Sequence, residues 1–89
     1  MDLPEGYGPD TDIDELAMPP VWLQLAAILI ARIETGRYRV GRAIPSLTQL
    51  TQEFGVSRGT VAKATKYLTD NGRAQSVHGR GVFVLPYGS

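Results

Sequence analysis

The residues best suited to chemistry are the basic and hydroxyl side chains of a segment, 55–69, that contains no acid. Arg58, near its start, can donate two parallel hydrogen bonds to O6 and N7 of a guanine. Lys63 and Lys66 carry charges that can contact phosphates. At about 100° per residue, these side chains share one arc of a helix with the small residues between them. The arc consists of Arg58, Gly59, Ala62, Lys63 and Lys66.

Two further groups of residues suit the same polyanion. Hydroxyl groups near the expected helix starts can donate to phosphate oxygens, as can the free backbone N–H groups there. The loop 78–81 alternates a histidine and an arginine with glycines, and arginine is favoured in a narrow minor groove. Thr48 fits a helix surface equally well, and His78 fits a solvent-exposed turn. The residues concerned are Ser46, Thr48, Ser57, Thr60, His78, Gly79 and Arg80.

Helical periodicity and capping residues predict the elements that position these side chains. Gln49 stands three residues after the N-cap Ser46 and completes a capping box, while Ser57 caps the next helix. A helix ends at Asn71-Gly72, where the glycine can adopt the left-handed conformation. The expected helices are 20–35, 47–54 and 58–70, and the expected strands are 74–77 and 82–85, with a further short strand possible near 42–44.

A short helix, a glycine-containing turn and a longer capped helix form a helix-turn-helix, whose second helix enters the major groove. The two strands and their loop then make a hairpin that can reach the neighbouring minor groove. The expected fold class is therefore mainly α with a small antiparallel β wing, a three-helix winged helix-turn-helix. Such a fold suits a protein that binds double-stranded DNA.

Charge divides the chain into two parts although the net charge is zero. Six of the nine acids and no Lys or Arg lie before Met18, whereas nine Lys and Arg and three acids follow Pro19, which gives that part a net charge of +6. We expect an acidic flexible tail at 1–18, a DNA-binding domain at 19–86 and a terminal stub at 87–89. Residues 12–18 could form a helical turn or two with Ile13 and Leu16 facing inward. The tail either solubilises the chain or competes with DNA for the basic domain.

Several function classes are excluded by composition. The chain has no cysteine and one histidine, so neither a disulfide framework nor a metal site is expected. No acid, base and nucleophile stand at a meaningful spacing, which argues against an enzyme, and no cofactor is expected. The most apolar window, 21–33, is too short to span a bilayer, and no secretory signal is visible. We therefore expect a cytoplasmic protein without a membrane partner.

Several segments together resemble one family of bacterial regulators. The most specific are FGVSRGTV at 54–61 and GRGVFV at 79–84, and the others are 24–26, 33–38, 44–46 and 71–72 with Leu68. Over about 20–84 the chain resembles the GntR-type winged helix-turn-helix. The resemblance implies a bacterial transcriptional regulator, which we interpret as a repressor, that binds a double-stranded DNA operator as a dimer.

The resemblance also implies roles for single residues. The family's base-contacting arginine maps to Arg58, and its minor-groove wing glycine maps to Gly79. Thr48 and Ala62 stand where the family often has arginines, so we expect a different operator. The family normally carries a C-terminal effector-binding domain, which the sequence up to Ser89 does not contain; if this sequence is the full protein, we expect no small-molecule effector site.

The first helix carries a second apolar stripe beside its core face. Either the N-terminal tail or a second copy of the protein must cover this stripe, because a surface helix should be polar there. We favour a homodimer through the first helix. The alternative function is a protein-interaction module that uses this apolar side. The stripe consists of Leu23, Ala27, Ile30 and Ala31.

Arg73 lies outside the first helix, and we expect its side chain to be solvated.

Overall fold

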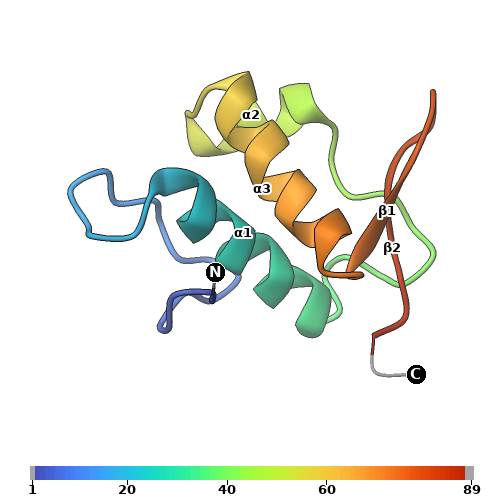
Figure 1. The fold of residues 1–89 in the computed structure, drawn as a ribbon, viewed down its shortest axis with the longest axis horizontal. Coiled ribbons are helices and arrows are strands. Elements are labelled where there is room, and N and C mark those ends of the chain that lie inside the picture. The colour runs from blue at the N-terminus through green and yellow to red at the C-terminus, as the bar shows by residue number, and fades with distance from the viewer. Residues whose placement is uncertain (1, 88–89) are drawn as a thin grey trace.

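The computed structural model describes residues 2–87, and within them three helices precede a two-stranded antiparallel sheet (Figure 1). α3 packs along α1, and α2 packs against α3. The predicted three-helix winged helix-turn-helix is confirmed. None of the helices in residues 2–87 has the length and apolarity needed to cross a lipid bilayer. The elements are α1 Val21–Glu34, α2 Leu47–Phe54, α3 Arg58–Asp70, β1 Ala74–Val77 and β2 Gly81–Val84.

Local capping fixes where α2 and α3 begin. Ser46 Oγ accepts a hydrogen bond from the Gln49 N–H at 3.1 Å, and Gln49 Oε1 accepts one from the Ser46 N–H at 2.8 Å. The predicted capping box is therefore confirmed. Gly55 ends α2 with φ 65°, a left-handed conformation that glycine adopts without steric cost. Ser57 Oγ then accepts from the Thr60 N–H at 3.1 Å, so α3 starts directly after the turn.

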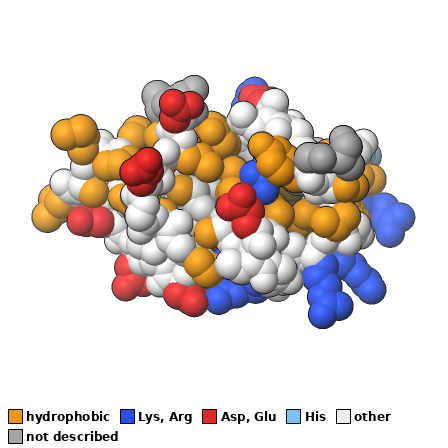
Figure 2. Space-filling model, turned by 90° about the horizontal axis from the view of Figure 1, so that it is seen from below, with side chains coloured by type: hydrophobic (Ala, Val, Ile, Leu, Met, Phe, Trp, Pro, Cys, Tyr) orange, Lys and Arg blue, Asp and Glu red, His pale blue; other side chains and the backbone are white. Residues whose placement is uncertain are grey.

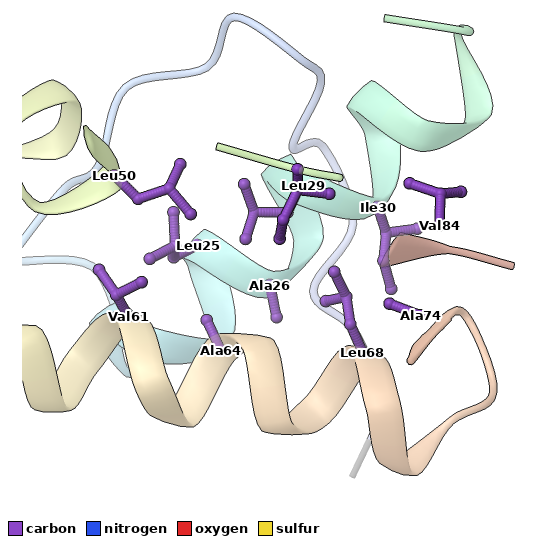
Figure 3. Packing of buried hydrophobic residues seen from close by; sticks show 11 residues of the cluster. Leu25, Ala26, Leu29, Ile30, Leu50, Val61, Ala64, Leu68, Ala74 and Val84 are labelled. Atoms are coloured by element: carbon purple, nitrogen blue, oxygen red, sulfur yellow. The ribbon is translucent and has the colours of Figure 1, made fainter. Parts of the chain in front are cut away.

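The core lies between α1 and α3 and extends to α2 and the hairpin (Figure 3). Leu25 and Leu29 of α1 point toward Leu50 of α2 and toward the buried face of α3, and all three leucines are fully buried. Because this packing joins α1 to both helices of the helix-turn-helix, it fixes the position of α3, whose outer side carries the arc of Arg58 and the lysines. The buried cluster comprises Leu25, Ala26, Leu29, Ile30, Ile44, Leu50, Val61, Ala64, Leu68, Ala74 and Val84.

The hairpin differs from its prediction by one residue. β2 begins at Gly81, not at residue 82, and ends at Val84, not at residue 85. Gly81 pairs with Val77 across the sheet. The loop therefore has three residues, 78–80, where four were expected. The sequence pattern assigns Gly81 to the turn, but it is the first residue of β2. Its φ of 117° is one that residues with a side chain rarely adopt, so the backbone conformation favours a glycine at this position.

The segment before α2 lies beside the hairpin. Ala43 forms an isolated bridge with Phe83, and the Ile44 N–H donates to the Val82 carbonyl at 2.8 Å. The short strand that was expected near 42–44 is reduced to this bridge. It still fixes the wing relative to the start of α2, because Pro45 and Ser46 follow at once.

The N-terminal segment packs against α1. The Gln24 side chain is fully buried and hydrogen-bonds the backbone of Asp14, and Leu3 and Ile13 pack on the core. Residues 12–18 contain a turn and no helix, and Leu16 is 97% exposed, so the expectation of a helical turn with Leu16 inward is wrong. Ile13 faces inward as predicted. The boundary between tail and domain at 18/19 remains a prediction.

A buried arginine also holds this segment. Arg32 Nε donates to the Pro9 carbonyl at 2.9 Å, Nη1 donates to Tyr38 Oη at 2.8 Å, and Nη2 lies 2.7 Å from Glu53 Oε2. The hydrogen bond with Glu53 raises the pKa of Arg32 above its ordinary value, so the guanidinium of Arg32 stays charged. Arg32 thus joins the N-terminal segment, α1 and α2.

Every residue of α1 from 23 to 30 is buried. Leu23, Ala27 and Ile30 are at most 5% exposed, and Ala31 is half-buried. Three of the four stripe residues are therefore buried within one chain, and Ile30 belongs to the core cluster that α1 shares with α3 and the hairpin. The expectation of an exposed apolar surface for a homodimer through α1 is not met, because Leu23, Ala27 and Ile30 offer almost no accessible surface to a second copy.

Arg73 is buried, and the expectation that it is solvated is wrong. Its Cζ lies 3.8 Å from the centroid of the Tyr87 ring, and its Nη2 lies 3.7 Å from Glu34 Oε2. Stacking on an aromatic ring and a nearby carboxylate offset the loss of hydration of a guanidinium. Its Nε is buried without a hydrogen-bond partner within residues 2–87. Arg73 therefore holds the chain after β2 against the end of α1.

Candidate nucleic-acid interface

The exposed start of α3 presents an unpaired cation and free backbone donors. Arg58 is exposed, and among the described residues its guanidinium forms no ion pair. Within residues 2–87 the backbone N–H groups of Arg58 and Gly59 have no acceptor. The start of a helix carries a partial positive charge, so this end attracts phosphate. The arrangement can bind an anion and read a guanine with one side chain.

Small residues leave room for close approach on the same arc. A Cβ placed on Gly59 would meet only Ser57 Oγ, at 3.9 Å, so packing within the chain does not require a glycine there. Ala62, one turn later, is exposed. The inner side of α3 is formed by fully buried Val61, Ala64 and Leu68. α3 is therefore divided into an apolar side and an outer side without bulky groups near its start.

The hydroxyl groups are partly engaged by caps. Ser57 Oγ and Thr60 Oγ1 lie 2.9 Å apart and share one proton, which leaves the other hydroxyl proton free to donate. Ser46 Oγ accepts a backbone hydrogen bond and keeps its own proton. Thr48 Oγ1 accepts a hydrogen bond from Arg58 Nη1 at 3.4 Å. Contacts of these four residues with phosphate stay predictions.

The two lysines of α3 differ in their surroundings. Lys63 Nζ lies 4.8 Å from the ring centroid of Trp22, in a cation–π contact with the first turn of α1. Lys66 Nζ lies 2.7 Å from Asp70 Oδ2, one helical turn further along. An exposed pair of this kind contributes little and is readily exchanged. The two lysines differ in net charge: Asp70 offsets the charge of Lys66, whereas the Trp22 ring leaves the charge of Lys63 uncompensated.

The tip of the wing is exposed at all three predicted positions, His78, Gly79 and Arg80. Gly79 has φ 73°, and no neighbouring atom would lie within 4 Å of a Cβ at this position, so the backbone conformation, not crowding, requires the glycine. The Arg80 guanidinium lies 5.8 Å from the Phe83 ring centroid and remains solvent-accessible. Arg80 and Ser46 line one groove of about 390 Å³ between the wing, α2 and α3.

Ion pairs within the chain reduce the free positive charge. Arg32, Arg37, Lys66 and Arg73 each lie within 4 Å of a carboxylate, the partners being Glu53, Asp10, Asp70 and Glu34. Among the described residues, the cations without such a partner are Arg39, Arg42, Arg58, Lys63 and Arg80.

Arg39 and Arg42 were not singled out from the sequence. Both are exposed in the segment between α1 and α2, and the Arg42 carbonyl accepts from the Val84 N–H at 2.9 Å. Val84 is the β2 residue farthest from the wing tip, so Arg42 lies at the opposite end of the hairpin from Arg80. The feature of the sequence that indicates Arg39 and Arg42 as unpaired cations is the absence of acids between Glu34 and Glu53.

Acids and cations are unevenly distributed over the surface. Figure 2 shows acidic side chains over the left end and centre of one face, whereas its right end carries Lys and Arg, which also lie at the centre and along the edges of that face. Asp10, in the N-terminal segment, pairs with Arg37 near the end of α1. In residues 2–87 no tail carboxylate forms an ion pair with α3 or the wing.

Comparison with known proteins identifies the family. The family described as "Bacterial regulatory proteins, gntR family" matches residues 22–84, which is more than half of the chain. The chain belongs to the gntR family. It is 43% identical over 54 residues to the HTH-type transcriptional regulator TreR of Bacillus subtilis, covering 61% of this chain and 23% of that protein. It is 35% identical over 65 residues to the repressor MngR of Escherichia coli, covering 73% and 27%.

Solved structures of this family share the fold. The DNA-binding domain of AraR in complex with operator ORR3 superposes with a TM-score of 0.73 at 33% identity, covering 84% of this chain and 90% of that one. YtrA from Sulfolobus acidocaldarius, a GntR-family transcription factor, gives a TM-score of 0.76 at 33% identity, covering 84% and 79%. The matched part of the chain spans about a quarter of the length of TreR and of MngR.

Proposed function

We propose that this gntR-family chain binds double-stranded operator DNA sequence-specifically, with α3 in the major groove and the wing in the adjacent minor groove. The observation that carries the proposal is the exposed, unpaired Arg58 on the first turn of α3, beside small residues and free backbone donors. The DNA-binding domain of AraR, which has the same fold, is bound to an operator in its crystal structure. The roles of Ser46, Ser57, Gly59, Thr60, Lys63, Lys66, His78, Gly79 and Arg80 as DNA contacts belong to this proposal.

Regulation would follow from occupancy of the operator. Relatives named as repressors include MngR and NagR, and repression is therefore the mode that we propose for this chain. Two copies would bind two half-sites one helical turn or more apart, as paired helix-turn-helix domains do. Because Leu23, Ala27 and Ile30 of the stripe are buried within one chain, an interface on another surface is the simpler arrangement for such a pair.

A protein-interaction module through the apolar side of α1 has less support. That function requires exposed apolar side chains, and Leu23, Ala27 and Ile30 are each at most 5% exposed. The free cations on α3 and the wing have no role in it. We therefore retain DNA binding as the proposal.

Selection of bound sequences from a random duplex pool tests the proposal. We expect enrichment of a defined motif, and inverted symmetry in that motif would report binding as a pair. Affinity for the selected duplex should fall steeply with salt, because each neutralised phosphate adds about 0.9 to the slope of log K against log salt. Recovery of unenriched sequences after repeated rounds would contradict sequence-specific binding.

A further inference from the structure

The first turn of α2 touches the cation that the proposed function assigns to base reading. Arg58 Nη1 donates to Thr48 Oγ1 at 3.4 Å, and within residues 2–87 this is the one hydrogen bond of the Arg58 side chain. The donor lies on the first residue of α3 and the acceptor on the second residue of α2. The contact thus bridges the two helices of the helix-turn-helix on its exposed side.

Thr48 sits on an element that cannot shift easily. The capping box fixes the start of α2, and Leu50 is fully buried in the core. Glu53, near the other end, pairs with the buried Arg32 of α1 at 2.7 Å. A hydroxyl on so restrained a helix can direct a long side chain from a neighbouring helix, because its own position varies little.

The geometry of the contact leaves the reading edge of the guanidinium free. Arginine carries five N–H donors in a planar fork, and the hydrogen bond to Thr48 uses one on Nη1. The edge formed by Nε and Nη2 keeps its donors for O6 and N7 of a guanine. At 3.4 Å the hydrogen bond is longer than the ordinary range of about 2.7–3.2 Å, so it biases the direction of the guanidinium weakly and lets it adjust to a base.

We propose that Thr48 is a specificity-determining residue, which directs Arg58 toward one base position through the hydroxyl of α2 and so narrows the bases that Arg58 accepts. The inference rests on the proposed DNA-binding function. Thr48 acts here as a positioning residue, and its effect on base discrimination passes through Arg58. A side chain without an acceptor would leave the guanidinium free to contact phosphate or a neighbouring base instead.

The test compares Thr48→Val, which keeps the shape and removes the acceptor, with Thr48→Ser, which keeps the hydroxyl. The probes are the duplex that the wild type selects from a random pool and duplexes in which each guanine of that motif is exchanged in turn. The measured quantity is the ratio of Kd values for exchanged and selected duplexes at one salt concentration. We expect Thr48→Val to lower this ratio about 3- to 10-fold at one guanine, and Thr48→Ser to retain it.

An Arg58→Ala background separates positioning from direct contact. If Thr48 acts through Arg58, Thr48→Val should leave the ratio unchanged once Arg58 is absent. Equal weakening of Thr48→Val on selected and exchanged duplexes would show a phosphate contact and overturn the proposal. A wild-type protein that selects no motif would instead contradict the proposed function itself. Circular dichroism and the Tm of each variant show whether it is folded.

Discussion

The side-chain carboxamide of Gln24 both accepts from and donates to the backbone of Asp14, which is the pattern that a neighbouring β-strand forms. Its Oε1 accepts from the Asp14 N–H at 2.9 Å, and its Nε2 donates to the Asp14 carbonyl at 2.9 Å and to the Pro19 carbonyl at 2.8 Å. The side chain is fully buried, so it is satisfied only by the N-terminal segment. This carboxamide makes the segment before α1 part of the fold.

The first prediction concerns this carboxamide. Gln24→Leu removes three hydrogen bonds and leaves the partly buried backbone groups of Asp14 without their partner. We expect the free energy of unfolding to fall by about 1–3 kcal/mol, the cost of unsatisfied buried polar groups. Urea denaturation followed by circular dichroism measures the change, and the N-terminal segment should become more sensitive to proteolysis.

Gln52→Leu is the matched control, since Gln52 is exposed on α2 and the exchange is identical. It should change the free energy of unfolding by no more than about 0.5 kcal/mol. Equal midpoints for the two variants would show that Gln24 does not hold the segment.

Much of the fold was predictable because its signals are local. Ser46 and Ser57 cap helices within three residues, and Gly55 ends one by its own conformation, so the bounds of α2 and α3 follow from neighbouring residues. The role of Gln24 was not predictable. Its partners are backbone groups up to ten residues away, and backbone groups leave no mark in a sequence pattern.

Side-chain surroundings were predicted less well than elements for a similar reason. Arg73 reads as a solvated cation, because nothing local shows that Tyr87 will stack on it after a hairpin. The arc of α3 follows from helical geometry alone, whereas the pairing of Lys66 with Asp70 requires side-chain positions. The contact between Arg58 and Thr48 spans a turn whose angle the sequence does not state.

The second prediction concerns Arg58. Arg58→Ala should weaken binding to the selected duplex by about 1–3 kcal/mol, or about 5- to 150-fold, and relax selectivity at one base pair. The reason is the loss of a bidentate contact to a guanine. Fluorescence anisotropy at fixed salt measures the affinity.

Arg39→Ala provides a control of equal charge change, since Arg39 is also exposed and unpaired among the described residues. Selectivity should remain intact in this variant. The assignment of Arg58 is wrong if both variants bind the selected duplex equally well.

The third prediction uses the contact of Lys63 with Trp22, the one tryptophan of the chain. A phosphate that draws Lys63 away from the ring should change the intrinsic emission when DNA is added. Lys63→Gln should reduce this change and lower the slope of log K against log salt by about 1. Titration of the protein with duplex at several salt concentrations measures both quantities.

Lys66→Gln is the comparison, because Lys66 lies on the same helix and is already paired with Asp70. It should lower the slope less than Lys63→Gln does and leave the emission change intact. An identical loss of slope in both variants would contradict the distinction between the two lysines.

The fourth prediction concerns the charge of the N-terminal segment, which we propose lowers binding to random DNA through its long-range field. The Debye length is about 30 Å at 0.01 M salt and about 8 Å at 0.15 M. The molecule is 34 Å long, so the carboxylates act on α3 and the wing across the molecule only at low salt. Neutralising four exposed acids should tighten binding to a random duplex several-fold at about 0.01 M salt and have little effect at about 0.15 M. The changes are Asp2→Asn, Glu5→Gln, Asp12→Asn and Glu15→Gln.

Asp10 and Asp14 are left unchanged in this variant, because Asp10 pairs with Arg37 and Asp14 Oδ1 accepts from the Leu16 N–H. Deletion of the segment would be a poorer test, since it would also expose the apolar side of α1. A control that exchanges Asp and Glu at the same four positions keeps the charge and should bind as the wild type does. Unchanged affinity of the neutralised variant at low salt would leave the segment with a structural and solubilising role alone.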